Sequence, residues 1–596
     1  MFQTFNVTAR PEQGPPRLQA LRTLMAAQGV DGFLIPRADA HQGEYVAPRD
    51  ERLAWLTGFT GSAGFCAALM DVAGVFIDGR YRTQVKHQVA PDFTPVPWPE
   101  VSLAQWLRDA MPGGGVVAFD PWLHPAGQIT ALAKEVADAG ISLRSVENFV
   151  DLIWADQPAP PNAPAAIHDL EFAGETHSSK RTRLAQDLVN AGQSSAVITL
   201  PDSLCWLLNI RGSDVAHNPV MHGLAILHAN GDVDLFADRA KLQDVLAHLG
   251  SSVSAHDPDT FPDALDALAG PVLIDPLTVP FAVSERLGPR AVTGSDPCAL
   301  PKARKNFAEV SGAAAAHIRD AAAVVETLAW LDDQPAGSIT EIDVVTALEG
   351  NRRADPALRD ISFETISGTG PNGAIMHYRV THDTNAPLME GQLLVLDSGG
   401  QYLDGTTDIT RTIAIGTPDS DAKSAYTRVL SGMIAMSRLR WPRGLAGRDI
   451  EAIGRMPLWL AGQDFDHGLG HGVGAYLSVH EGPQRLSKVS SVPIEAGMIL
   501  SNEPGYYREG AFGIRIENLL VAQTADAIEG GDAHREMLVW QTLTYVPFDR
   551  RLIDTALLAP AERAWIDAYH AQVAQKIEAR LSPKAKTWLD AATAPL

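Results

Sequence analysis

A strand that ends on a carboxylate is the feature that most constrains this chain. Four apolar residues, Leu393–Leu396, run directly into Asp397, and a second aspartate, Asp408, opens the strand-like segment "DITRTIAI". If these segments pair as antiparallel strands around a turn near Tyr402 and Leu403, the two carboxylates face each other. Neighbouring buried carboxylates repel, so one must stay protonated unless a cation lies between them. The pattern therefore predicts a buried cation site, with a solvated hairpin carrying surface acids as the plainer alternative.

The C-terminal half supplies further residues of the kinds that bind metal ions. His467 and His471 stand in "DHGLGHGVG", where the interleaved glycines favour a loop over a helix. The segment "MILSNEPGYY" ends a strand on Glu503, and the alternation in "FGIRIENLLV" puts Arg515 and Glu517 on one strand face. A glutamate on the inner face of a mostly apolar strand is costly unless it is paired or bound to a metal.

Five of these side chains are candidates for one dinuclear metal centre. They are Asp397, Asp408, His471, Glu503 and Glu517. Their four carboxylates balance the charge of two divalent cations, and an oxygen-rich set suits Mn²⁺ better than a structural Zn²⁺ site. Two ions about 3.5–4 Å apart can bridge a water molecule and lower its pKa, which produces a nucleophile near neutral pH.

Three other motifs point to different chemistry but lack a required part. "GTGPNG" at Gly368 matches the dinucleotide-binding pattern, yet Pro371 and the strand-like "AIMHYR" stand where a helix is needed. "HEGPQ" begins like a zincin motif, but Gln484 occupies the position of the second histidine. A serine-hydrolase elbow is also missing, because Thr60 replaces its first glycine before Ser62.

Length and charge limit the remaining possibilities. A chain of 596 residues is too long for one hydrophobic core, so several domains are expected. The formal net charge of −23 argues against nucleic acid as a partner, and no apolar run is long enough to span a membrane. Three widely spaced cysteines and an N-terminus without an apolar signal segment favour a cytoplasmic protein.

The first half of the chain reads as one α/β module present twice. Each copy runs from a helix into a strand, then through Trp-Leu followed shortly by glycine, to a strand that closes on an acid and an arginine. The expected domains are 1–155 and 167–300, joined by the Pro/Ala-rich linker 156–166. Duplication is the favoured explanation, with chance likeness between two α/β modules as the alternative. Neither copy clusters histidines with acids, so catalysis is expected elsewhere.

The chain resembles the Xaa-Pro aminopeptidases, in their larger three-domain cytosolic form. The likeness rests on "ISGTGPNGAIMHY", "LDSGGQYLDGTTDITRT", "HGLGHGVGAYLSVHEGP", "SNEPGYYREGAFGIRIEN" and "EMLVWQTLTYVPFDRRLID", in this order. It implies an α/β fold in which two related N-terminal domains of the creatinase/prolidase type precede a pita-bread catalytic domain, 301–555. A helical extension, 556–596, is then expected to support a homodimer, with Trp565, Ile566 and Tyr569 as its apolar stripe.

The resemblance also implies roles for individual residues. Asp397 would bind one metal ion, His471 and Glu503 the other, and Asp408 and Glu517 would bridge them. Glu503 would exchange protons with the bridging water, while His377, His480 and the nearby His467 would contact the peptide substrate. Arg515 would support a ligand carboxylate. The two ions are expected to be Mn²⁺, with Zn²⁺ or Co²⁺ as alternatives.

The implied reaction is removal of the N-terminal residue from peptides with proline in second position. Two alternatives stay open at this point. One is a relative on the same fold, such as a prolidase-type dipeptidase, a methionine aminopeptidase or a creatinase-like hydrolase. The other is a non-catalytic pita-bread domain that binds proteins, which would gain nothing from five metal-ligating side chains.

Overall fold

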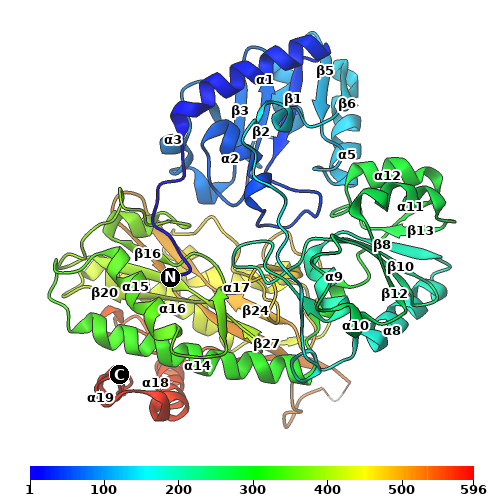
Figure 1. The fold of residues 1–596 in the computed structure, drawn as a ribbon. Helices are drawn as coiled ribbons and strands as arrows, with labels where there is room; N and C mark the ends of the chain where they lie inside the picture. Colours follow the sequence, from blue (N-terminus) through cyan, green and yellow to red (C-terminus); the bar gives the residue numbers. More distant parts are fainter. Residues whose placement is uncertain (533) are drawn as a thin grey trace. The chain divides into compact units, whose positions relative to one another are not determined.

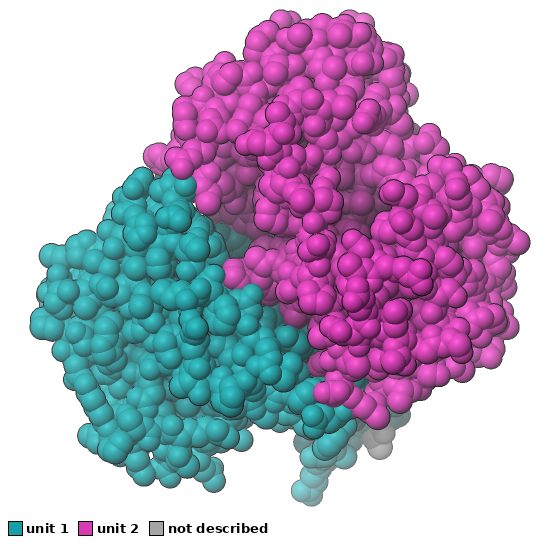
Figure 2. Space-filling view, in the orientation of Figure 1, with its two compact units in different colours: residues 1–7, 171–174, 303–596 teal, residues 8–170, 175–302 magenta. Residues whose placement is uncertain are grey.

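The computed structural model describes residues 1–532 and 534–596, and these form two compact units (Figure 2). Unit 1 comprises residues 1–7, 171–174 and 303–596, and unit 2 comprises residues 8–170 and 175–302. The boundary between residues 302 and 303, where unit 2 ends, lies close to residue 301, the expected start of the catalytic domain. Residues 1–7 differ from the expectation, because they belong to unit 1 and not to the first α/β module. None of the described helices combines the length and apolar character needed to cross a bilayer.

Unit 2 contains two six-stranded sheets with the same strand order and the same pattern of parallel and antiparallel pairs (Figure 1). The first sheet is β4 (Thr94–Pro97), β3 (Ala73–Ile77), β2 (Phe65–Leu69), β1 (Gly32–Pro36), β5 (Gly115–Phe119) and β6 (Ile141–Ser145). The second is β12 (Val253–His256), β11 (Val233–Phe236), β10 (Leu224–His228), β8 (Ser195–Ile198), β13 (Val272–Ile274) and β14 (Ala291–Thr293). This shared topology supports the predicted duplication.

The repeated Trp-Leu motif marks the end of a helix in each module. Helix α2 (Arg52–Thr57) stops at Gly58 with φ +88°, and α9 (Pro201–Leu208) stops at Asn209 with φ +50°. Glycine and asparagine are the residues that adopt this left-handed conformation at least cost, and the turn ends the helix. Each motif therefore fixes the point at which the chain leaves its helix.

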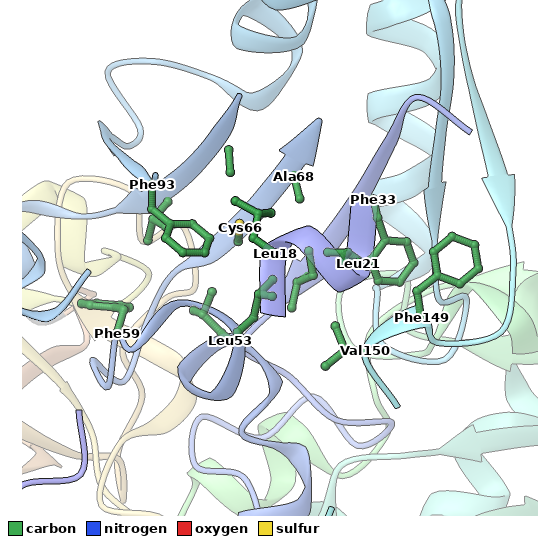
Figure 3. Packing of buried hydrophobic residues seen from close by; sticks show 14 of the residues in the cluster. Leu18, Leu21, Phe33, Leu53, Phe59, Cys66, Ala68, Phe93, Phe149 and Val150 are labelled. Carbon is green, nitrogen blue, oxygen red and sulfur yellow. The ribbon is translucent and has the colours of Figure 1, made fainter. Parts of the chain in front are cut away.

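Helix α1 (Gly14–Gln28) packs its apolar face onto the first sheet (Figure 3). Leu18 and Leu21 are fully buried in a cluster that also contains Phe33 of β1 and Cys66 of β2. The ring of Phe33 stacks on Phe149, with 4.8 Å between the ring centroids. All three cysteines of the chain are buried and form no disulfide.

Unit 1 is built around the long helix α14 (Phe307–Asp332) and several short sheets (Figure 1). Asn306 caps α14 by accepting hydrogen bonds from two backbone amides of the first turn, and alanines dominate its buried side. The largest sheet has the order β21 (Arg440–Pro442), β28 (Met537–Thr542), β27 (Asn518–Thr524), β24 (Ile499–Asn502), β22 (Gly470–Gly472) and β23 (Glu481–Leu486). A second sheet joins β16 (Ile366–Thr369), β17 (Leu393–Ser398) and β20 (Ile409–Ala414).

The chain ends in two helices of unit 1, α18 (Pro560–Ile577) and α19 (Pro583–Ala592). Pro560 suits the first turn of α18, where its missing N–H has no intrahelical partner. Ile566 and Tyr569 are buried within the chain itself, and Trp565 is half-buried with its ring stacked on Tyr569. The predicted apolar stripe is therefore not an exposed face that a second copy would have to cover.

The first residues of the chain lie beside helix α15 (Glu341–Arg352) in unit 1, where Figure 1 marks the N-terminus. Gln3 donates a side-chain hydrogen bond to the carbonyl of Thr365 at 3.3 Å and accepts one from its amide at 2.8 Å. The backbone amide of Phe2 donates to Glu349 at 2.8 Å. This short segment thus continues the structure of unit 1.

Candidate metal centre

The five predicted ligands lie on or beside five strands of unit 1. Asp397 is the fifth residue of β17, Asp408 directly precedes β20, and His471 is the middle residue of β22. Glu503 directly follows β24, and Glu517 lies between β26 (Phe512–Arg515) and β27. Strand ends are suitable positions because the backbone can turn there and present the side chain to a neighbouring strand.

Three overlapping groups bring all five ligands together. Within each group, one possible ligand atom per residue lies within 4.8 Å of the others. The groups are Asp397, Asp408 and Glu517; His471, Glu503 and Glu517; and Asp408, His471 and His480. Because the groups share members, the arrangement suits two neighbouring ions better than one.

The pairing of the two aspartate strands differs in register from the prediction. Strands β17 and β20 are antiparallel, as expected, but Asp397 lies opposite Thr410 and not opposite Asp408. The two carboxylates still share one face, because residues two apart along a strand point the same way. Between them the chain forms a small hairpin of β18 (Gly400–Tyr402) and β19 (Gly405–Thr406) in the same register. Its turn at Leu403 and Asp404 lies one residue later than expected, which accounts for the shift.

The carboxylates are deeply buried and perturb one another. Asp397, Asp408 and Glu517 are 8%, 3% and 1% exposed. Burial raises the pKa of Asp408 well above its ordinary value, and the charges of Asp397 and Glu503 add to this. Burial likewise raises the pKa of Glu517, reinforced by Asp408 and Glu503. The protein thus holds acids where they resist ionising, which is the situation that divalent cations relieve.

The hydrogen bonds of these carboxylates leave oxygens for a cation. Asp397 Oδ2 accepts from Arg515 at 2.6 Å and Glu517 Oε2 accepts from Thr410 at 2.8 Å. The other oxygens, Asp397 Oδ1 and Glu517 Oε1, are buried without a hydrogen-bond partner in the described structure. A buried carboxylate oxygen without a donor is costly, and a metal ion would supply the missing partner. The residues therefore fit a divalent-metal centre.

His471 presents its Nε2 atom to the same space. Its Nδ1 atom lies 3.0 Å from the carbonyl oxygen of Gly472, so Nδ1 carries the proton that it donates. Its Nε2 atom is 3.5 Å from Asp408 Oδ2 and 3.3 Å from Glu503 Oε1. This tautomer leaves the Nε2 lone pair for a metal, as is usual for histidine ligands.

Arg515 links the ligand Asp397 to another predicted site residue. Arg515 Nη2 donates to Asp397, and its Nη1 atom donates to the Tyr507 hydroxyl at 2.7 Å. That hydroxyl lies 2.9 Å from Nε2 of His467. Arg515 thus contacts the carboxylate of the predicted ligand Asp397. The expected single strand through Arg515 and Glu517 is wrong, because strand β26 ends at Arg515 and β27 begins at Asn518. Between the two strands, the Glu517 amide donates a hydrogen bond to the Thr410 carbonyl.

The remaining predicted histidines have different surroundings. The ring of His480 lies 4.3 Å from that of His471, close enough to join the group with Asp408. His377 is half-buried beyond the 3₁₀ turn Gly370–Ala374 and belongs to none of the three groups among the described residues. The strand expected at "AIMHYR", residues 374–379, does not form, because the chain continues from this turn in bends and irregular structure, and the described segment contains no dinucleotide-binding helix.

Sequence reasoning missed three supporting residues. The Thr410 hydroxyl donates a hydrogen bond to Glu517, and the Tyr507 hydroxyl accepts one from Arg515. The Ser501 hydroxyl donates to Glu503 at 3.0 Å. For two of them a signal exists in the spacing, because Thr410 and Ser501 each lie two residues from a ligand and so share its strand face. Tyr507 carries no such signal, since the hairpin of β25 (Gly505–Arg508) and β26 brings it to Arg515.

Four family profiles match successive parts of the chain. The "Creatinase/Prolidase N-terminal domain" matches residues 17–153 and, in a second version, residues 156–309. "Metallopeptidase family M24" matches residues 311–524, which contain all five predicted ligands. The "C-terminal region of peptidase_M24" matches residues 536–596. The two N-terminal matches agree with the duplicated topology of unit 2, and the third is the pita-bread catalytic domain.

Individual relatives match along almost the whole chain. A probable Xaa-Pro aminopeptidase P of Coccidioides posadasii is 38% identical over 98% of this chain and 100% of its own length. Aminopeptidase P2 of Arabidopsis thaliana is 37% identical over 97% and 88%. The crystal structure of the Caenorhabditis elegans X-prolyl aminopeptidase, described as a cytosolic enzyme with a di-nuclear active site, covers 98% of this chain and 100% of its own, at 31% identity and a TM-score of 0.94. This chain therefore belongs to the Xaa-Pro aminopeptidase P family of M24 metallopeptidases.

Proposed function

We propose that this chain removes the N-terminal residue from peptides whose second residue is proline. The observation that carries the proposal is the convergence of four carboxylates and His471, with two buried carboxylate oxygens left for metal ions. An Xaa-Pro bond needs a dedicated enzyme, because the proline nitrogen has no N–H and its ring fixes φ near −65°. General aminopeptidases that bind this N–H, or an extended backbone, handle such substrates poorly.

Asp397, Asp408, His471, Glu503 and Glu517 would hold two divalent ions, with Mn²⁺ as the favoured metal and Zn²⁺ or Co²⁺ as alternatives. When bound, the ions would polarise the scissile carbonyl and lower the pKa of a water molecule. Replacing Asp408 with Asn removes a negative oxygen from two of the three ligand groups. Elemental analysis of that variant should show lost metal, and full activity in a metal-free wild-type preparation would contradict the metal assignment.

Glu503 would be the residue that moves protons in this reaction. Its carboxylate is half-buried and held by Ser501, so one oxygen is fixed while the group stays accessible. It would accept the proton of the attacking water and pass it to the proline nitrogen as the peptide bond breaks. His377, His467 and His480 would contact the peptide, with His467 oriented by the Tyr507 hydroxyl.

The substrate experiment compares kcat/KM for Arg-Pro-Pro, Arg-Ala-Pro and Arg-Pro. An Xaa-Pro aminopeptidase should cleave Arg-Pro-Pro best, because a contact with the carbonyl after proline needs a third residue. Comparable cleavage of Arg-Ala-Pro would contradict selectivity for proline. A preference for the dipeptide would instead indicate a prolidase, and no hydrolysis of any peptide would indicate a binding module. The Glu503→Gln protein, prepared in parallel, corrects for contaminating peptidases.

The working form proposed for this enzyme is a cytoplasmic homodimer that acts on peptides. The C. elegans relative is described as cytosolic, and the net charge of −23 disfavours nucleic acid as a partner. The stripe first considered for dimerisation is covered within the chain, so the dimer needs a different surface of the catalytic unit. Light scattering on the purified protein tests this directly, since the mass of a single chain would contradict the dimer.

A further inference from the structure

Arg411 is a fully buried arginine that lies directly behind the metal centre. Thr410 and Thr412 of β20 share the face of the centre with Asp408, which directly precedes the strand, and Arg411 points to the opposite face. Its side chain is 2% exposed. All of its hydrogen-bond acceptors in the described structure are uncharged oxygens, which is unusual for a buried cation.

The guanidinium of Arg411 clamps the two backbone segments that carry Thr410 and Glu517. One nitrogen donates to the carbonyl of Thr410 at 2.8 Å and to that of Glu517 at 2.6 Å. A second nitrogen donates to the side-chain oxygen of Asn518 at 2.8 Å. Thr410 and Glu517 are also joined by their side chains, because the threonine hydroxyl donates to the ligand carboxylate at 2.8 Å. Arg411 therefore fixes the backbone of a metal ligand and of the residue that orients it.

The C-terminal region holds Arg411 from the other side. The guanidinium donates to the carbonyls of Val546 and Pro547 and, at 3.1 Å, to the hydroxyl of Tyr569 on α18. That hydroxyl also accepts from the Val546 amide at 3.2 Å and lies 3.0 Å from the Thr544 carbonyl. The ring of Phe548 stacks on that of Tyr569, with 4.8 Å between the ring centroids. The Phe548 ring also lies under the guanidinium, whose central carbon is 4.8 Å from the ring centroid.

We propose that Tyr569 is a positioning residue for the metal centre, which acts through Arg411 on the backbone of Glu517. The C-terminal region would then be part of the support of the active site and not only an appendage. A planar guanidinium suits this role, because its rigid fork holds several acceptors at fixed angles. Loss of the Tyr569 hydroxyl removes one of the acceptors that hold the Arg411 guanidinium in place. The guanidinium then holds the backbone of Glu517 less firmly in the geometry that its metal requires.

The test compares two tyrosine-to-phenylalanine variants of the full chain. Tyr569→Phe keeps the stacked ring but loses the hydroxyl that meets Arg411. Tyr545→Phe is the matched control, because Tyr545 is a stacked neighbour, 6.2 Å from Tyr569, whose hydroxyl also bonds a backbone carbonyl but does not reach Arg411. For each protein, the dissociation constant of Mn²⁺ is measured by chelator competition, and the unfolding temperature is measured without metal.

We expect Tyr569→Phe to bind Mn²⁺ about tenfold more weakly, at the lower end of the roughly 10–100-fold losses seen when the supports of metal ligands are removed. At saturating Mn²⁺, kcat should fall while KM stays within about twofold, and Tyr545→Phe should match the wild type in all three constants. Equal Mn²⁺ affinity in Tyr569→Phe and the wild type would overturn the proposal, whatever happens to the unfolding temperature.

A double variant tests the route to the centre. Thr410→Val removes the hydroxyl that also supports Glu517, and it is combined with Tyr569→Phe. If both changes act on this carboxylate, the double variant should lose less Mn²⁺ affinity than the product of the two single-variant losses. A full product would indicate independent effects and would reject the route through Glu517.

This inference rests on the proposed metal centre, yet the two can fail separately. If the wild type binds no Mn²⁺, the metal proposal fails, whereas an unaffected Tyr569→Phe protein rejects only the positioning role.

Discussion

Arg515 donates from its Nη2 atom to the Oδ2 atom of Asp397 over 2.6 Å, and both side chains are buried. This guanidinium changes the charge of the centre, because four carboxylates and one guanidinium together carry −3. With two divalent ions the centre would be positive by one charge. It would therefore attract one further anionic group, which the carboxylates alone do not imply.

Replacing Arg515 with Lys should weaken metal binding, because an ammonium cannot reproduce the fork that meets Asp397 and Tyr507 together. We expect a loss of roughly 10–100-fold in Mn²⁺ affinity, with part of the activity restored by excess Mn²⁺. Titration of the metal-free protein measures this. An unchanged affinity would mean that Arg515 does not set the position of Asp397.

The change Glu503→Gln should preserve the fold and remove most of the turnover. The amide has nearly the same shape but cannot take up a proton, and general acid–base groups typically contribute roughly 10²–10⁴-fold. Steady-state kinetics on Arg-Pro-Pro, together with metal analysis, separate a lost proton acceptor from a lost ligand. Turnover within a few-fold of the wild type would exclude the assigned role.

Stability of unit 1 should depend on the buried pair Asp320 and Arg352. The carboxylate accepts two hydrogen bonds from Arg352, at 2.6 and 3.1 Å, and one each from Tyr402 and Thr407. Asp320→Ala would leave a buried guanidinium without its counter-charge, which costs about 3–5 kcal/mol in free energy of unfolding. Urea unfolding checks this.

The double variant Asp320→Leu with Arg352→Met serves as the control. It removes both charges, so it should recover part of the lost stability. If the double variant is no more stable than Asp320→Ala, the loss comes from packing and not from the uncompensated charge.

His570 should make the protein less stable in mild acid. Burial, assisted by the nearby Arg411 and Arg550, lowers the pKa of His570 from 6.5 to about 4. Between these values the unfolded chain binds a proton that the folded chain does not, so the free energy of unfolding falls as the pH drops from about 6.5 toward 4. From pH 7 to pH 5 the loss due to this group is about 2 kcal/mol.

A His570→Gln variant isolates this effect from the other buried histidines. Glutamine can still accept the hydrogen bond that the Phe548 amide now donates to His570 Nε2 at 3.1 Å, but it cannot be protonated. The variant should therefore lose less stability than the wild type between pH 7 and pH 5. Equal losses in the two proteins would show that His570 does not carry this pH dependence.

The four acidic ligand candidates could be predicted from the sequence because each one lies in, directly after or directly before an apolar strand. A carboxylate at such a position, as in Asp397 and Glu503, is costly without a partner, and few alternatives to a cation exist. The exact register of β17 and β20 was not predictable, because it depends on the intervening hairpin. The break between Arg515 and Glu517 was hidden for a related reason, since the alternation of side chains continues through it.

The role of the C-terminal helix could not be predicted from its own residues. An apolar stripe at helical spacing specifies that a face is buried, but not whether the same chain or a second copy covers it. The contact of Tyr569 with Arg411 joins residues far apart in the sequence, and no local pattern encodes it. Similarly, the duplicated order of strands was readable in the first half, whereas the place of residues 1–7 was not.

The place of residues 1–7 has a consequence for how the chain folds during translation. Gln3 bonds Thr365, and Phe2 bonds Glu349, so residues 1–7 have their docking site in a part of the chain that is made much later. Unit 2 is synthesised in between and can fold as the chain emerges, while residues 1–7 wait for the rest of unit 1. Unit 1 thus completes its structure only after synthesis has passed through unit 2.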